Sequence, residues 1–127
     1  ALLELKKVDA EDALEAFCEA SNLLYNEEYE SYGAFDCGEP VGYCLFLLRG
    51  GRLTLIDAGA RPEYGDALLD GLVRSVLGYA RSCGVGPAEF AGSFDEAAFA
   101  RLRAFGFANK LIEDIDKFLS TCKNCAK

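Results

Sequence analysis

The 127-residue chain contains no histidine, and this limits which side chains could perform chemistry. Histidine has the ordinary pKa closest to neutral pH, and it is the base that activates the usual serine and cysteine nucleophiles. A Ser-His or Cys-His nucleophile is therefore excluded, and any acid or base must be a carboxylate, thiol, phenol, ammonium group or water. Five of the six tyrosines supply candidate phenols, although strand aromatics commonly serve packing. They are Tyr25, Tyr29, Tyr32, Tyr43 and Tyr64.

Six cysteines could in principle form disulfides or bind a metal. They are Cys18, Cys37, Cys44, Cys83, Cys122 and Cys125. No secretory signal is recognisable, so we expect a cytoplasmic protein whose thiols stay reduced and mostly buried. Only Cys122 and Cys125 are closely spaced, and they supply two of the four ligands that a structural zinc site needs. We therefore favour free thiols, no metal site, and a C-terminal tail over residues 121–127.

The acidic residues are concentrated in the first half of the chain. Residues 1–64 contain thirteen acids and five bases, whereas residues 65–127 contain eight of each, and no Lys or Arg occurs between Asp9 and Glu39. Such a charge attracts a cationic amine and repels phosphate groups, so nucleic acid is not an expected partner. The alternative is an ordinary solvated helix face. That alternative accounts less well for Glu27, Glu28 and Glu30 than for the acids that precede them.

Composition and length favour one globular domain over residues 1–120, followed by the tail. Hydrophobic residues make up 51% of the chain and charged residues 27%, which excludes a disordered or coiled-coil protein. The longest apolar run, Val41 to Leu48, is far shorter than the roughly 20 residues of a membrane-spanning helix. We therefore expect a globule that does not enter a membrane.

Hydrophobic periodicity predicts a mixed α/β domain. Strands are expected at residues 2–7, 29–35, 41–48, 52–58 and 88–92, with the last strand or strands within 107–119. Helices are expected at residues 10–24, at 67–83, and after a capping box at 93–96. The strands between residues 29 and 58 should form an antiparallel meander. The fourth strand should pair in parallel with the fifth, through the long helix.

Two segments resemble parts of the GCN5-related N-acetyltransferases, the GNAT family. Pro62-Glu63-Tyr64, then Gly65, then Ala67-Leu68-Leu69 are similar to that family's turn and helix after its fourth strand. Asp95-Glu96-Ala97-Ala98 and the later Phe105-Gly106-Phe107 resemble its late helix, which closes in Leu-Gly-Phe. With the order of elements, the resemblance covers nearly the whole chain. It implies the acyl-CoA N-acyltransferase fold and transfer of an acetyl group to an amine.

The resemblance also implies where acetyl-CoA would bind. Backbone N–H groups at the start of the long helix would hold the pyrophosphate. These groups belong to Gly65, Asp66 and Ala67. The end of the fourth strand would pair with the pantetheine arm, at Ala58, Gly59 and Ala60. The alternative for residues 65–66 is a simple helix start, in which an acidic residue is favourable.

This sequence departs from the family pattern at two places. Part of the glycine-rich loop is missing between Tyr64 and Gly65, and Asp66 puts a negative charge beside the expected pyrophosphate. Leu102 stands where the family often has a tyrosine that protonates the thiolate of coenzyme A. We therefore expect weak or no binding of acetyl-CoA. The alternative function is a binding module that has kept the fold and lost catalysis.

An N-acetyltransferase needs a base near the gap between the fourth and fifth strands, because an ammonium group must lose a proton before it attacks a thioester. Asp57 and Glu63 are nearest along the sequence and are the candidate catalytic residues. Asp57 fits this role if it points inward, and otherwise it is the polar partner in the strand's alternation. By the resemblance, the first half of the chain is the acceptor side. Its candidate residues for binding a small-molecule or peptide amine are Glu27, Glu28 and Glu30. We expect the protein to be a monomer or a homodimer.

Overall fold

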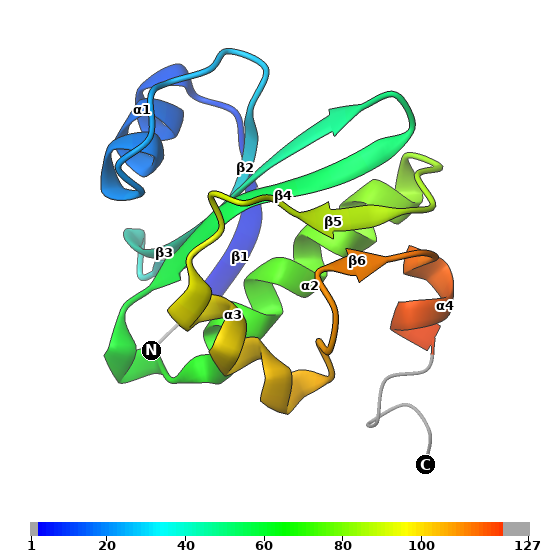
Figure 1. The fold of residues 1–127 in the computed structure, drawn as a ribbon. Coiled ribbons are helices and arrows are strands. Elements are labelled where there is room, and N and C mark those ends of the chain that lie inside the picture. The colour runs from blue at the N-terminus through cyan, green and yellow to red at the C-terminus, as the bar shows by residue number, and fades with distance from the viewer. Residues whose placement is uncertain (1–2, 121–127) are drawn as a thin grey trace.

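The fold is a six-stranded mixed sheet with helices on both faces, described for residues 3–120 by a computed structural model (Figure 1). The strands are β1 (Leu3–Val8), β2 (Glu30–Asp36), β3 (Glu39–Arg49), β4 (Arg52–Ala60), β5 (Ala88–Phe90) and β6 (Leu111–Ile112). The helices are α1 (Glu11–Ala20), α2 (Asp66–Ser82), α3 (Glu96–Leu102) and α4 (Ile115–Ser120), with 3₁₀ turns η1 (Pro62–Tyr64) and η2 (Arg103–Phe105). No helix in this range has the length and apolarity needed to cross a membrane.

The strands lie in the sheet in the order in which they occur in the chain. β4 and β5 are parallel, and every other neighbouring pair is antiparallel. The predicted α/β class, the antiparallel meander and the parallel pair joined through the long helix are confirmed.

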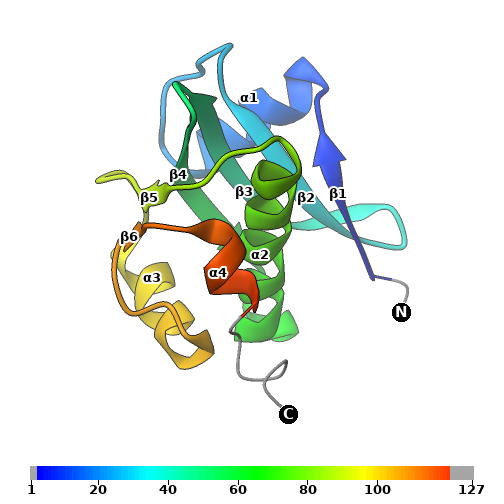
Figure 2. The ribbon, with the colours of Figure 1, turned by 90° about the vertical axis from the view of Figure 1, so that its right-hand side faces the viewer.

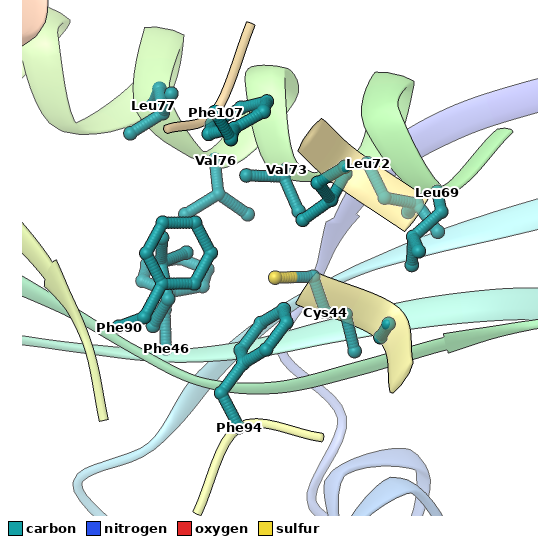
Figure 3. Close-up of a cluster of buried hydrophobic side chains, with 14 of the residues drawn as sticks. Cys44, Phe46, Leu69, Leu72, Val73, Val76, Leu77, Phe90, Phe94 and Phe107 are labelled. Carbon is teal, nitrogen blue, oxygen red and sulfur yellow. The ribbon is translucent and has the colours of Figure 1, made fainter. Parts of the chain in front are cut away.

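The larger hydrophobic core lies between the sheet and α2. The apolar residues of α2 recur every three or four positions, so they form one stripe that packs on β2, β3 and β4. Figure 3 shows this stripe facing Cys44 and Phe46 of β3, with Phe90, Phe94 and Phe107 completing the cluster. Each fully buried Leu or Val contributes about 1.5–3 kcal/mol. The labelled members on α2 are Leu69, Leu72, Val73, Val76 and Leu77.

A smaller core lies on the other face of the sheet, beneath α1. Figure 2 shows α1 on the opposite side of the strands from α2. Leu14, Phe17 and Cys18 are buried on α1 and pack against Leu45 and Ile56 of the sheet. The acids of α1 therefore lie on its outer face, as an amphipathic helix requires.

Arg74 fastens α2 to the last part of the described chain. Its Nε donates to Asp70 at 2.9 Å and its Nη2 donates to the Phe105 carbonyl at 2.6 Å. The guanidinium also lies over the rings of Phe107 and Phe118, 5.3 and 5.2 Å from their centroids. One side chain thus joins α2 to η2 and α4.

Three predicted boundaries are corrected. The first helix ends at Ala20, and the segment expected to form the last strands contains the two residues of β6 followed by α4. Two apolar residues, Phe118 and Leu119, follow Ile115 by three and four positions. This spacing suits a helix that packs on α2 rather than a strand. The N-cap of α3 is Asp95, whose carboxylate accepts the Ala98 N–H, so the capping box expected from Ser93 is absent.

The prediction that the thiols are mostly buried holds for only half of those described. Cys18 and Cys44 are buried, Cys37 and Cys83 are exposed, and all four are free. Cys122 and Cys125 lie outside the described residues.

We expect Cys37 and Cys83 to be alkylated in native protein, and Cys18 and Cys44 only after unfolding. Burial raises the pKa of the Cys18 and Cys44 thiols, so they stay protonated and unreactive at neutral pH. Peptide mass spectrometry after alkylation, with and without denaturant, measures each site separately. Equal native labelling of Cys44 and Cys37, or a disulfide joining any of these four thiols, would contradict the packing.

Candidate active site between β4 and β5

β4 separates from β5 about halfway along its length. The two strands pair only where Leu53–Leu55 lies beside Ala88–Phe90. The last bond between them is the Ala91 N–H donating to the Leu55 carbonyl at 2.8 Å. After this bond, the chain that follows β5 leaves the sheet and leads to α3 (Figure 1). Among the described residues, the second half of β4 therefore has a sheet neighbour on the β3 side only.

A β-bulge in β4 lies at the same point. Leu45 pairs with Asp57 and Phe46 pairs with Leu55, which leaves Ile56 as an extra residue on β4. Asp57 is opposite Leu45, whose side chain belongs to the α1 core, and directly opposed residues share a face of the sheet. The Asp57 carboxyl group therefore lies on the α1 face.

The free edge of β4 consists of Ala58, Gly59 and Ala60. The Arg61 N–H donates to the Val41 carbonyl of β3 at 2.9 Å. Because backbone groups alternate in direction along a strand, Ala58 and Ala60 point theirs away from β3, into the space that β5 has left. Within residues 3–120, no partner is found for these groups on that side. This edge is the feature that the resemblance predicted for a pantetheine arm.

Asp57 ties β4 to the start of α3. Its side chain is only 7% exposed, and Oδ1 accepts the Asp95 N–H at 2.9 Å. Close by, the Ser93 hydroxyl donates to the Ile56 carbonyl at 2.8 Å. These two bonds bridge the gap just beyond the end of the β4–β5 pairing. The structure thus places Asp57 inward and beside the free edge.

Glu63 lies elsewhere, exposed on η1 after the end of β4. It forms no hydrogen bond or ion pair within the described chain. The turn itself is fixed to the β2–β3 hairpin, because the Tyr64 hydroxyl donates to Asp36 and Arg61 ion-pairs with Glu39 at 2.9 Å. The bond to Asp36 raises the pKa of Tyr64.

The start of α2 lacks a built phosphate cradle. Gly65 has φ 79°, which a glycine tolerates without strain, and no side chain caps the helix. Gly65, Asp66 and Ala67 are exposed, so their N–H groups are accessible to an anion. However, the Asp66 carboxylate lies in the same turn, and its partner Arg101 is 3.8 Å away. The donors are present, but the local charge opposes a pyrophosphate.

The structure does not gather the three glutamates into one site. Glu28 ion-pairs with Arg49, and Glu30 ion-pairs with Lys7 at 3.1 Å. Glu27 is exposed, with no cation within ion-pair distance in the described part of the chain. Glu30 begins β2, so β3 separates it from β4.

Tyr43 is a residue of this site that sequence reasoning named only as one of five phenols. Its ring stacks on Phe17, with centroids 5.1 Å apart, and its hydroxyl is 2.6 Å from the Ser21 hydroxyl. It is paired with Gly59 across the β3–β4 ladder. A shallow groove on the α1 face is lined by Tyr43, Gly59 and Ala60 among other residues. The signal that could have found it is this register, which sets a glycine opposite a tyrosine.

No model of a protein family matches the chain, and no curated protein matches its sequence. The fold is similar to the ribosomal-protein-S18-alanine N-acetyltransferase from Escherichia coli, at TM-score 0.59 and 17% identity over 83% of this chain and 77% of that one. It is also similar to the IAA acetyltransferase from Bacillus cereus, at TM-score 0.61 and 15% identity over 81% and 75%.

A third similar structure is the PaiA N-acetyltransferase from Thermoplasma acidophilum, in complex with coenzyme A. Its TM-score is 0.52 at 12% identity, over 71% of this chain and 79% of that one. Identities this low establish likeness of fold and nothing finer. With the element order and the parallel β4–β5 pair, they show that this chain has the GNAT acyl-CoA N-acyltransferase fold.

Proposed function

We propose that the protein is an acyl-CoA-dependent N-acyltransferase whose donor lies along the free edge of β4. The observation that supports this most directly is the backbone of Ala58 and Ala60, whose groups on the side away from β3 have no partner within residues 3–120. Backbone N–H and C=O groups on an open sheet edge can pair with an extended chain containing amides, as they would with an added strand. The pantetheine arm of acetyl-CoA is such a chain.

The residues present fit the arm better than they fit the phosphates. The N–H groups of Gly65, Asp66 and Ala67 would face the pyrophosphate, but Asp66 repels it and Arg61 is already paired with Glu39. We therefore infer that the donor is held mainly by its pantetheine portion. Bound acetyl-CoA supplies the activated acyl group as a thioester.

Asp57 is the proposed base, because it is buried beside the free edge on the α1 face. It would accept a proton from the attacking amine as the new C–N bond forms and the C–S bond breaks. Glu63 is exposed and farther along the chain, so its proposed role is limited to conducting protons from solvent. Changing Asp57 would also loosen the start of α3, since it accepts the Asp95 N–H.

The proposed acceptor is a cationic small-molecule or peptide amine. The four acids of α1 have no ion pair within residues 3–120, and Glu27 adds a fifth uncompensated charge. Charge of one sign on the α1 side raises the local concentration of a cation. Glu28 and Glu30 would contribute less than Glu27, because each already has a cationic partner.

The first prediction concerns the donor. We expect acetyl-CoA and S-acetylpantetheine to bind with dissociation constants within about threefold of each other, because the phosphate end contributes little attraction. Asp66→Asn should strengthen binding of acetyl-CoA by up to about fivefold, the size of a charge effect at a helix start, and leave S-acetylpantetheine unchanged. Titration calorimetry measures both. Asp116→Asn, at an exposed carboxylate paired with Arg81, is the matched control.

Transfer is measured in the same samples as release of free thiol when an amine is added. Amine-dependent release supports the enzyme. Donor binding without release favours the binding module, and failure of both donors to bind at the β4 edge would overturn the enzyme and leave the fold alone.

The second prediction concerns the acceptor. The triple change of Glu27, Glu28 and Glu30 to Gln should raise the KM for spermidine by about threefold or more at low salt. Exposed charges are screened over about 8 Å at physiological ionic strength, so the difference should shrink as salt is added. The matched control changes Glu4, Glu89 and Glu113 to Gln, because two of these also have cationic partners. If the two triple variants change the KM for spermidine equally, the three glutamates are not an acceptor site, and the acidic charge of the first half serves solubility alone.

A further inference from the structure

β1 is an edge strand whose outer side is open. It pairs with β2 along its whole length and is the first strand in the order of the sheet. Alternate residues of an antiparallel strand direct their N–H and C=O groups away from the neighbouring strand, and no partner for these outer groups of β1 is found among residues 3–120. Figure 2 shows β1 at one margin of the sheet, and the described helices lie over the faces of the sheet instead of beyond this edge. Such an edge can pair with a further strand.

The side chains of β1 alternate between the two faces of the sheet. Leu5 packs against the larger core, so the odd-numbered residues lie on the α2 face. Val8 packs with the smaller core beneath α1, so Glu4 and Lys6 lie on the α1 face. The side chains of Glu4 and Lys6 are 62% and 54% exposed. One acid and one base therefore stand two positions apart on the same face of the open edge.

Lysine on an edge strand commonly discourages association, so the two lysines of β1 need separate accounts. Lys7 is already engaged within its own chain, because its Nζ lies 2.6 Å from Asp9 and 3.1 Å from Glu30. Lys6 is more exposed, and its ion pair within the described chain, to Glu4 at 3.7 Å, is long and of little energetic weight. The cation that a second strand would meet is therefore Lys6.

Charge selects one register for pairing between two copies of β1. An antiparallel pair with two-fold symmetry has its axis at one residue, because directly opposed residues share a face of the sheet. Two such registers pair five of the six residues of β1, one centred on Leu5 and the other on Lys6. The register centred on Lys6 sets two lysines directly opposite each other, which is destabilising. The register centred on Leu5 opposes no like charges, and it sets Glu4 opposite the partner's Lys6 on both sides of the axis.

We propose that β1 is the contact surface for a second copy of this chain, in an antiparallel pairing centred on Leu5. Leu3, an apolar side chain that is 43% exposed, then lies against the methylene stem of the partner's Lys7. The two sheets join into one. Because β2 and β3 separate β1 from β4, the free edge of β4 stays open in the dimer. The inference therefore does not depend on the proposed function.

The test measures the dissociation constant of the dimer by sedimentation velocity, in reducing buffer and over a wide range of protein concentration. We expect wild type to dimerise. Glu4→Lys and Lys6→Glu should each weaken the dimer by about tenfold or more, because each change sets like charges opposite one another on both sides of the axis. An equimolar mixture of the two variants should form a heterodimer, since every altered position then meets an opposite charge.

The double variant Glu4→Lys/Lys6→Glu should also recover the dimer. Glu89→Lys is the matched control, because it makes the same charge change at an exposed carboxylate of β5 that is paired with Arg52. It should leave the dissociation constant unchanged. If the two single variants dimerise as strongly as wild type, the contact lies elsewhere and the proposal is overturned. Failure of their mixture to associate would overturn it too.

Hydrogen exchange of wild type gives a readout that requires no variant to fold. The outer amides of β1 should exchange more slowly as protein concentration rises, because the second strand protects them. Protection that does not change with concentration would mean that a segment of the same chain covers the edge, and it would overturn the proposal. A wild-type protein that stays monomeric at every concentration would do the same. Acetyl transfer is measured separately, so the proposed function stands or falls independently of these results.

Discussion

The pairing of β4 determines the rest of this structure. A strand in a sheet has backbone groups on two edges, and each buried group needs a partner. β4 satisfies one edge with β3 along its length, but it keeps β5 only as far as Leu55. The bulge at Ile56, the Ser93 hydroxyl and the Asp57 carboxylate lie at the point of departure. They complete the pairing for a short distance, and beyond it the groups of Ala58 and Ala60 that face away from β3 have no partner among residues 3–120.

The two faces of the sheet contribute different parts to this edge. On the α2 face, apolar packing joins α3 to the larger core and buries Leu102. On the α1 face, Tyr43 and Asp57 bring a phenol and a carboxylate beside the same few residues. The short turn η1, fastened to the β2–β3 hairpin, carries the chain directly into α2. A donor would therefore meet specific chemistry along its arm and little attraction at its phosphates.

Much of the fold could be predicted from the sequence, because it depends on periodicity that is local. The helical spacing of α2, the meander and the parallel crossover follow from apolar patterns and connection rules. α4 was missed because six residues with two charges and a short apolar pattern fit a strand nearly as well. The exposure of Cys37 follows from its place in the β2–β3 turn, where it has φ 53°.

The candidate site was predicted less completely, because its geometry depends on partners that are distant in sequence. The free edge at Ala58–Ala60 was expected, but the bulge that turns Asp57 to the α1 face is a property of register with β3. The acidic cluster looked unopposed because Arg49 and Lys7 lie outside the segment in which the charges were counted. Tyr43 gains its position from Gly59, sixteen residues later in the chain and directly across the ladder.

Backbone amide NMR of the wild-type protein tests the central claim most directly, because it observes the edge itself. Adding S-acetylpantetheine should shift the Ala58 and Ala60 amide signals and slow their exchange with solvent, since these N–H groups point into the gap. The Gly59 amide, which points toward β3, should change less. Unchanged Ala58 and Ala60 signals under saturating donor, or changes confined to the segment between η2 and α4 that contains β6, would contradict the account.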